Sequence, residues 1–204
     1  TPNNGAKAIL RQNKAGLIMF VPTDSIDEYK ESWKDQNMWS MTGKVAVFSS
    51  EFIGSDELIK DGVLYGYFGE NENYTPKGIT EVYCGAFEDN ANVKKVVFEN
   101  GLTTIGASAF VGCEQLALVV IRTENMPAIK NYKLGTTTYK KVFDDDKVTL
   151  RVSGTAYNDF AAETNYNAAE LQRVSYKITL VNGEETKEIT TFLFMTIKFP
   201  KVER

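Results

Sequence analysis

The chain has 204 residues, 43% of them hydrophobic and 12% aromatic, which is enough for one large domain or two small domains with a buried core. Its formal net charge of −4 and its lack of a basic stretch argue against nucleic acid as a partner. Histidine is absent, which excludes Ser-His-Asp and Cys-His nucleophile systems and every histidine-ligated metal site.

The first predicted elements lie in residues 17–33, "LIMFVPTDSIDEYKESW", which read as a strand, a proline-containing turn and a short amphipathic helix capped by Asp24 or Ser25. The same order is predicted for residues 149–165, "TLRVSGTAYNDFAAETN", with Thr155 as the cap. We interpret the two segments as strand-turn-helix end units. Aligned at an offset of 131, they match Met19 with Leu150, Val21 with Val152, and Tyr29 with Phe160.

Residues 44–68 are predicted to form strands outside any repeat. The stretch "DGVLYGYFG" (61–69) is the best candidate for exposed aromatic residues, because its glycine spacing favours a strand over a helix. Exposed aromatic side chains stack on sugar rings or anchor protein interfaces. We therefore predict a ligand-binding site at Tyr65, Tyr67 and Phe68, with core packing as the alternative interpretation.

A repeat follows, in which residues 79–101 match residues 102–124 at an offset of 23. A period of roughly 20–29 residues is typical of stacked repeats, whose copies bury their apolar faces on one another. Each copy is expected to add one short strand to a parallel sheet, and residues 73–78 predict a third, more polar strand. The aligned apolar residues are Ile79 with Leu102, Val82 with Ile105, Ala86-Phe87 with Ala109-Phe110, Val93 with Leu116, Val96-Val97 with Val119-Val120, and Phe98 with Ile121.

The second copy carries the pattern I-x-x-x-A-F-x-x-C-x-x-L-x-x-V-x-I over residues 105–121. This pattern resembles the BspA-like leucine-rich repeat family of bacterial cell-surface proteins. Residues 82–98 match it with Asn90 in the cysteine position, and the specific part covers roughly residues 73–124. The resemblance implies export, display at the cell surface with a lipid anchor as one form of attachment, and adhesion to host protein, mucin or polysaccharide.

The two cysteines, Cys84 and Cys113, are too few for a four-ligand zinc site. At the offset of 23, Cys84 aligns with Ala107 rather than with Cys113, and a disulfide needs Cα atoms within about 7 Å. We therefore predict two buried thiols without a disulfide. No histidine is present to activate either thiol, so neither is predicted to be catalytic.

Acidic stretches offer two further candidate sites. Residues 69–73, "GENEN", and residues 144–147, "DDDK", supply oxygen ligands for Ca²⁺, but neither has the spacing of an EF-hand, so we predict solvated loops. Paired carboxylates at a fixed separation would serve a glycosidase, although nothing in the sequence fixes a separation. The candidate pairs are Glu28 with Glu31 and Glu184 with Glu185.

Residues 176–199 predict a β-hairpin with its turn at Asn182-Gly183. Together these elements predict a mainly β fold with short helical or 3-10 turns. The expected architecture is a leucine-rich-repeat-like right-handed solenoid with strand-turn-helix end units and a C-terminal β-hairpin. The expected segments are an end unit at 1–43, strands and repeat copies at 44–124, a second end unit at 125–174 and the hairpin at 175–204.

The function predicted from these observations is that of a non-enzymatic extracellular or cell-surface binding module. Its expected partner is a host or matrix protein or a glycan, with no nucleic acid and no cofactor. No apolar run approaches the roughly 20 residues of a membrane-spanning helix, so no transmembrane segment is expected. The alternative is a structural spacer domain of a larger surface protein with no ligand of its own, and a glycan-active enzyme is a third, weaker hypothesis.

Overall fold

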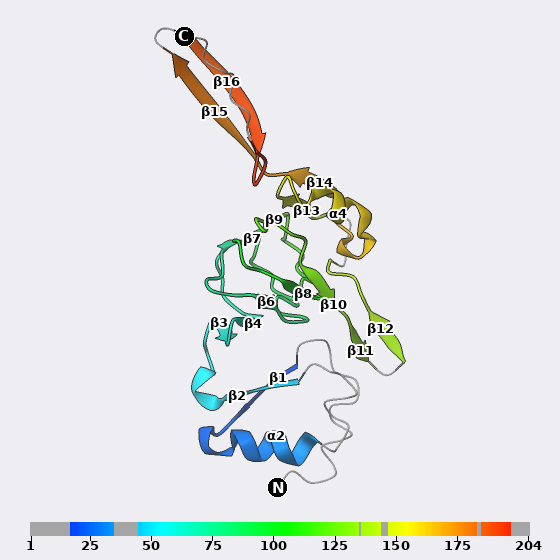
Figure 1. Ribbon diagram of the computed structural model, residues 1–204. Coiled ribbons are helices and arrows are strands. Elements are labelled where there is room, and N and C mark those ends of the chain that lie inside the picture. The colour runs from blue at the N-terminus through cyan, green and yellow to red at the C-terminus, as the bar shows by residue number, and fades with distance from the viewer. Residues whose placement is uncertain (1–16, 35–44, 135, 144–146, 183–184, 197–204) are drawn as a thin grey trace.

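The computed structural model describes residues 17–34, 45–134, 136–143, 147–182 and 185–196. Within these residues the chain is mainly β with few, short helices, as its β-branched runs predict. The described strands form two five-stranded sheets and three two-stranded sheets. Figure 1 shows an N-terminal unit at one end, the two larger sheets in the middle and a hairpin that projects at the other end.

The first large sheet has the strand order β10-β8-β6-β4-β3, and all neighbours are parallel except the antiparallel pair β3 and β4. The second large sheet has the order β14-β13-β9-β7-β5 and is parallel throughout. The first sheet consists of β3 (Glu57–Lys60), β4 (Val63–Tyr67), β6 (Glu81–Val82), β8 (Thr104–Gly106) and β10 (Ala128–Lys130). The second consists of β5 (Asn73–Tyr74), β7 (Lys95–Phe98), β9 (Leu118–Ile121), β13 (Thr149–Val152) and β14 (Glu170–Arg173).

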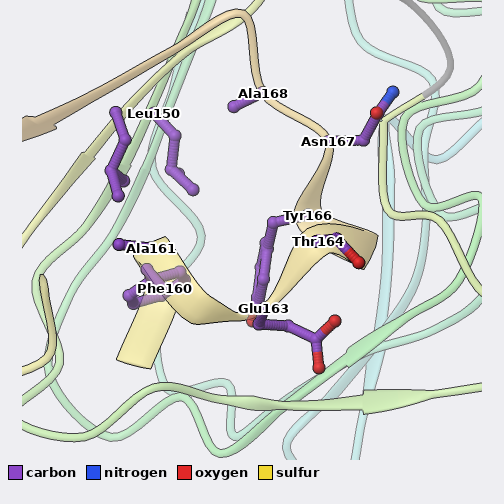
Figure 2. A pocket seen from close by; sticks show the side chains of 9 residues that line it. Leu150, Phe160, Ala161, Glu163, Thr164, Tyr166, Asn167 and Ala168 are labelled. Atoms are coloured by element: carbon purple, nitrogen blue, oxygen red, sulfur yellow. The ribbon is translucent and has the colours of Figure 1, made fainter. Parts of the chain in front are cut away.

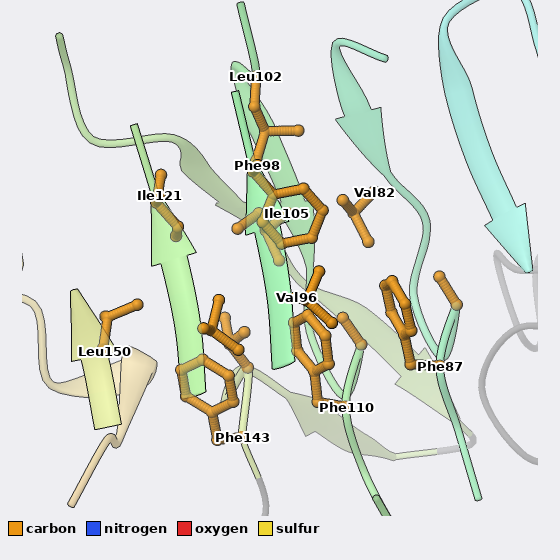
Figure 3. Close-up of a cluster of buried hydrophobic side chains, with 14 of the residues drawn as sticks. Val82, Phe87, Val96, Phe98, Leu102, Ile105, Phe110, Ile121, Phe143 and Leu150 are labelled. Carbon is orange, nitrogen blue, oxygen red and sulfur yellow. The ribbon is translucent and has the colours of Figure 1, made fainter. Parts of the chain in front are cut away.

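One large cluster of buried side chains joins these two sheets (Figure 3). Phe87, Phe110 and Phe143 stack through it, with ring centroids 4.7 Å and 5.3 Å apart. Phe87 and Phe110 hold the same position in the two repeat copies, and each follows a fully buried alanine, Ala86 or Ala109. The small residue lets neighbouring backbones approach closely while the phenylalanine ring fills the space between the sheets.

The prediction of a right-handed, leucine-rich-repeat-like solenoid is wrong. The described strands form several small sheets, none of them closed or wound into a solenoid. The offset of 23 holds where Val96 pairs with Val119, but Leu118 pairs with Thr149, 31 residues later. An antiparallel hairpin that the sequence analysis did not predict, β11 (Tyr132–Leu134) and β12 (Thr137–Tyr139), lies within that longer interval. A repeat array needs each unit to stack on its neighbour with one spacing, and here only two copies keep it.

The third strand predicted for residues 73–78 is β5, but its register differs by one residue from the sequence match. The match places Asn73 beside Val96, whereas Tyr74 pairs with Val96 in the sheet. Tyr74 is buried and Asn73 is exposed. The register follows burial of the tyrosine ring, because an asparagine amide in the inward position would need hydrogen-bond partners that an apolar core lacks.

The strand-turn-helix order predicted at both ends is confirmed. The first unit contains β1 (Leu17–Val21), the 3-10 turn η1 (Thr23–Ser25) and α2 (Ile26–Lys34), and β1 pairs in parallel with β2 (Val45–Ser49). Asp24 and Ser25 lie inside η1, and Pro22, the residue before η1, makes no side-chain capping bond.

The second unit follows β13 with α4 (Tyr157–Ala162) and the 3-10 turn η3 (Thr164–Tyr166). Capping by Thr155 is wrong, since its hydroxyl donates to the Glu124 carbonyl at 2.8 Å. The Ser153 hydroxyl instead accepts from the Ala156 amide at 3.3 Å.

The predicted C-terminal hairpin is confirmed as β15 (Ser175–Asn182) paired antiparallel with β16 (Glu185–Phe192). Gly183, the second residue of its predicted turn, lies outside the described residues. Both cysteines are buried and no disulfide joins them, as predicted. Cys84 packs with Ala107, its partner at the repeat offset, and the Cys113 thiol donates to the Phe87 carbonyl at 2.9 Å.

Candidate functional site

The three aromatic residues predicted to bind a ligand have different surroundings. Phe68 is 56% exposed and Tyr65 is half-buried, whereas Tyr67 is only 2% exposed. The Tyr67 ring stacks on Tyr74 with centroids 3.8 Å apart, and its hydroxyl accepts from the Asn71 amide at 3.2 Å. The expectation that Tyr67 is exposed is therefore wrong, because this side chain belongs to the core.

A β-bulge explains the position of Tyr67. Simple alternation from buried Leu64 would direct Tyr67 outward, because side chains of a strand alternate between its two faces. In the β3–β4 hairpin, however, Leu58 pairs with Gly66 and Ile59 pairs with Leu64, so Tyr65 is an extra residue on β4. The extra residue reverses the alternation beyond it, and both Leu64 and Tyr67 enter the core cluster.

Aromatic rings continue from Tyr65 into the N-terminal unit. The centroid of the Phe48 ring lies 5.1 Å from that of Tyr65 and 5.7 Å from that of Phe52, and both pairs have edge-to-face geometry. On its other side, Tyr65 lies 4.9 Å from Tyr83. Phe48 is 3% exposed, so it forms the buried centre of this group. Edge-to-face pairs stabilise such clusters beyond the area they bury, which makes the junction between the N-terminal unit and the β3–β4 hairpin a well-packed base.

Four exposed apolar side chains lie in the segments that form or adjoin this base. Phe20 pairs with Phe48 across β1 and β2, so their side chains lie on the same face of that sheet. Ile18 lies on that face too. Its side chain and that of Phe68 both approach Gly66: a Cβ atom added to this glycine would lie 3.1 Å from Ile18 Cδ1 and 2.7 Å from Phe68 Cζ. We call the four exposed residues the apolar patch: Phe20 is 38% exposed, Phe52 40%, Ile53 67% and Phe68 56%.

Burial and nearby carboxylates raise the pKa of the Tyr65 phenol beside this patch. Burial is the largest cause, the carboxylates of Glu81 and Asp61 raise the pKa further, and Lys130 opposes them. Lys130 also forms an ion pair with Glu81 at 2.5 Å. At neutral pH Tyr65 therefore offers an uncharged hydroxyl that donates or accepts one hydrogen bond, next to the carbon surface of Phe48.

The exposure of Phe20, Phe52 and Ile53 was not predicted from the sequence. A signal for the last two was present, because "SSEFIGS" (49–55) places two large apolar residues among serine, glutamate and glycine, where burial of a strand or helix face is not expected. Phe20 gave no such signal, since it lies in an apolar strand and only the structure shows which of its two faces is covered.

A pocket of about 320 Å³ lies beside α4 and η3 (Figure 2). Its lining mixes polar residues with apolar ones, which include Leu150, Phe160 and Leu171. Glu163 is the acidic residue in the lining, and its carboxylate accepts from the backbone amide and the side-chain amide of Asn165 at 2.9 and 2.7 Å. A carboxylate held in this way supports the local turn and lacks the second carboxylate that glycosidase chemistry requires.

A second pocket of about 320 Å³ lies on the outer face of the parallel sheet, where basic residues of three strands meet. Arg122 forms an ion pair with Glu99, the equivalent residue of the previous repeat copy, at 3.0 Å. The Arg151 Nε atom donates to Gln172 at 2.7 Å, and the Arg173 guanidinium lies 4.0 Å from the Tyr157 ring centre. Each arginine thus has a partner within the chain, so these residues do not support an anion-binding site in this pocket.

The acidic candidate sites are spread over the surface. Glu28 and Glu31 are exposed on α2, and Glu72 pairs with Lys94 at 2.5 Å. Residues 144–146 and Glu184 lie outside the described residues. Where the structure describes the chain, no group of three or more cysteine and acidic residues is arranged to hold a metal ion. None of the helices described is long and apolar enough to cross a membrane.

Three comparisons with known proteins find no relative of this chain. A scan against protein-family models, a search of curated proteins and a search of solved structures each return no match.

Proposed function

We propose that the chain is a non-enzymatic binding module that attaches to a partner surface through the apolar patch. The observation that carries the proposal is the exposure of Phe20 and Phe52 beside the buried Phe48 ring, together with that of Phe68 near Ile18 and of Ile53 next to Phe52 in the chain. Exposed apolar side chains that gather on one surface mark interaction sites, and aromatic anchors on a rigid base contribute most of the binding energy of an interface.

The partner class follows from two lines of support. Phenylalanine faces with a tyrosine hydroxyl beside them suit the apolar face of a sugar ring or the side chains of an extended protein. The resemblance of residues 105–121 to BspA-like repeats supports an extracellular or cell-surface location, including attachment through a lipid anchor. The proposed ligand is accordingly a host or matrix protein, mucin or polysaccharide.

The test is a binding screen of the full chain against mucin, polysaccharides and extracellular-matrix proteins. Phe68→Ala and Phe52→Ala should each weaken binding to any hit by about tenfold, the effect expected for an aromatic anchor. Tyr139→Ala is the matched control, because Tyr139 is a similarly exposed aromatic residue, at 36%, on the separate β11–β12 hairpin. Binding that survives both patch variants would move the site elsewhere. No binding to any probe would favour the spacer domain.

A further inference from the structure

The C-terminal hairpin formed by β15 and β16 projects from the molecule and has contacts with the rest of the chain mainly at its base (Figure 1). There the Gly154 amide donates to the Leu193 carbonyl at 3.0 Å, and the Leu193 amide donates to the Val174 carbonyl at 3.1 Å. The Arg173 guanidinium also lies 5.5 Å from the Phe192 ring centre. These contacts fix where the hairpin leaves the body, but they cover neither of its faces.

The two faces of the hairpin differ in chemistry. In the antiparallel register Ile178 pairs with Ile189, and the same face carries Tyr176 and Leu180. Tyr176 is 42% exposed, and the other three side chains are half-buried. The opposite face is richer in polar residues, with Lys177 lying 3.8 Å from the Glu188 carboxylate, although it also carries Val181 near the turn and Phe192 at the base. The face of Ile178 includes a charged residue, Lys187, opposite Leu180. A two-stranded sheet is at best marginally stable in water, so an uncovered apolar face favours the addition of further strands.

The two outer edges of the hairpin are protected unequally. β16 carries three charged residues, Glu185, Lys187 and Glu188, whereas β15 carries one, Lys177. Charged residues on an edge strand block pairing with other chains, and a long edge with few charges invites it. β15 has eight residues and, among the residues that the structure describes, no strand pairs with its outer edge.

We propose that two copies of this chain associate by antiparallel pairing of their β15 strands about a two-fold axis at Ile178. Residues opposite each other in an antiparallel pair lie on the same face, so this register places Ile178 against Ile178 of the second copy. It also places Tyr176 against Leu180 and Lys177 against Thr179, and no two charges of the same sign face each other. The result is a four-stranded sheet with a row of four isoleucines, Ile189-Ile178-Ile178-Ile189, across its apolar face.

The charge pattern explains why β15 rather than β16 forms the contact. A two-fold axis that keeps the apolar faces on the same side must lie between two copies of the same residue, because only then do residues of the same face oppose each other. Centred on Lys187 or Glu188, pairing of β16 would bring two like charges directly together, which destabilises a pair. Centred on Ile189 it would avoid that repulsion, but it would place Lys187 and Glu188 of both copies in the new ladder, where charged edge residues oppose pairing. The self-complementary register of β15 avoids that repulsion, so a second copy of the same chain is the occupant that fits this edge.

The experiment combines sedimentation of the full chain with site-specific crosslinking. Sedimentation velocity should show a shift from the 22.8 kDa monomer toward twice that mass as concentration rises. Ile178→Cys should then crosslink to its counterpart under mild oxidation with diamide, because directly opposed residues lie within disulfide reach. Leu180→Cys is the matched control on the same strand and face, since its counterpart would lie about 13 Å away, four residues along the pair.

Both native cysteines are buried, so they do not compete for the oxidant at the surface. The expected result is a dimer yield at least tenfold higher for Ile178→Cys than for Leu180→Cys, with both variants melting like the native chain. A chain that stays monomeric at every concentration would overturn the proposal. So would equal crosslinking of the two variants, or a dimer that forms without the Ile178 crosslink.

Discussion

Asn90 and Cys113 occupy the same position in successive repeat copies, and each ties its copy to the segment before it. The Cys113 thiol donates one hydrogen bond to the Phe87 carbonyl. Asn90 does more, because its amide nitrogen donates to the carbonyls of Tyr67 and Gly69 at 3.3 and 3.2 Å. Asparagine in the cysteine position therefore gives the first copy two hydrogen bonds to the segment before it, where cysteine gives the second copy one.

Asn90→Ala should lower the free energy of unfolding by about 3 kcal/mol, because it leaves several buried groups without partners at once. Besides the two carbonyls, the side-chain oxygen of Asn90 accepts from the amides of Asn92 and Val93, both at 3.0 Å. Asn90→Cys should cost less, since a thiol keeps one donor, and Asn92→Ala on the exposed neighbour should cost almost nothing. Chemical denaturation measures all three. A loss below about 0.5 kcal/mol for Asn90→Ala would contradict the assignment.

At the scale of single elements, two residues before helix α4 are of types that cap helices. These are Ser153 and Thr155, and the sequence favoured Thr155. In the structure Ser153 is fully buried and accepts from the Ala156 amide, while Thr155 bonds to a distant carbonyl. Ser153→Ala should therefore cost about 1 kcal/mol of stability. Thr155→Val serves as the comparison in the same denaturation series, because it removes the hydrogen bond to the Glu124 carbonyl and keeps the one from the Ala156 amide. No measurable loss for Ser153→Ala would contradict its role at the start of α4.

The elements predicted from sequence are those whose apolar residues repeat at a fixed spacing. Val82 and Ile105, and likewise Val96 and Val119, pair as the offset of 23 predicts. The sequence could not predict Leu118 beside Thr149, because that pairing depends on how the intervening hairpin packs. It also could not predict the path of the sheets, since a repeat of two copies fits many arrangements of the flanking strands.

The exposed aromatic residues of the candidate site were also predicted only in part. Phe68 was predicted to be exposed from its glycine-rich strand, and it is. Tyr67, one residue earlier, is buried because a bulge at Tyr65 reverses the alternation, and no residue of "DGVLYGYFG" marks that bulge unambiguously. Phe20 and Phe52 join Phe68 only through contacts between segments that are far apart in the chain, which periodicity within one strand does not reveal.

At the scale of the whole molecule, the core is unusually rich in phenols. Tyr74, Tyr83, Tyr132 and Tyr166 are all buried, and they lie at intervals along the chain from the third strand-forming segment to the second end unit. The Tyr166 hydroxyl donates to the Pro127 carbonyl at 2.7 Å, and the Tyr74 hydroxyl donates to the Glu57 carboxylate. Removing the proton from any of them places a charge in an apolar surrounding, so the fold depends on keeping these phenols neutral.

This dependence predicts that the protein loses stability in alkali. Burial is the main cause that raises the pKa of each of the four hydroxyls above 10.0, to about 12 for Tyr132. Below about pH 10 the phenols are protonated in both the folded and unfolded chains, so the stabilisation is fully present. Above it the unfolded chain loses protons first, and stability falls until pH passes the folded-state values.

Thermal unfolding followed from about pH 8 to pH 11, across the usual tyrosine pKa of about 10, should therefore show a flat Tm and then a steady decline. Tyrosinate absorbance at each pH reports whether deprotonation accompanies unfolding. Tyr132→Phe is the matched variant, because it removes one phenol whose pKa is raised to about 12 while keeping the ring that packs with Cys84 and Ala107. Its Tm should decline less steeply above pH 10. An identical slope in the variant, or tyrosinate absorbance that rises fully before unfolding begins, would show that the buried phenols do not govern stability in alkali.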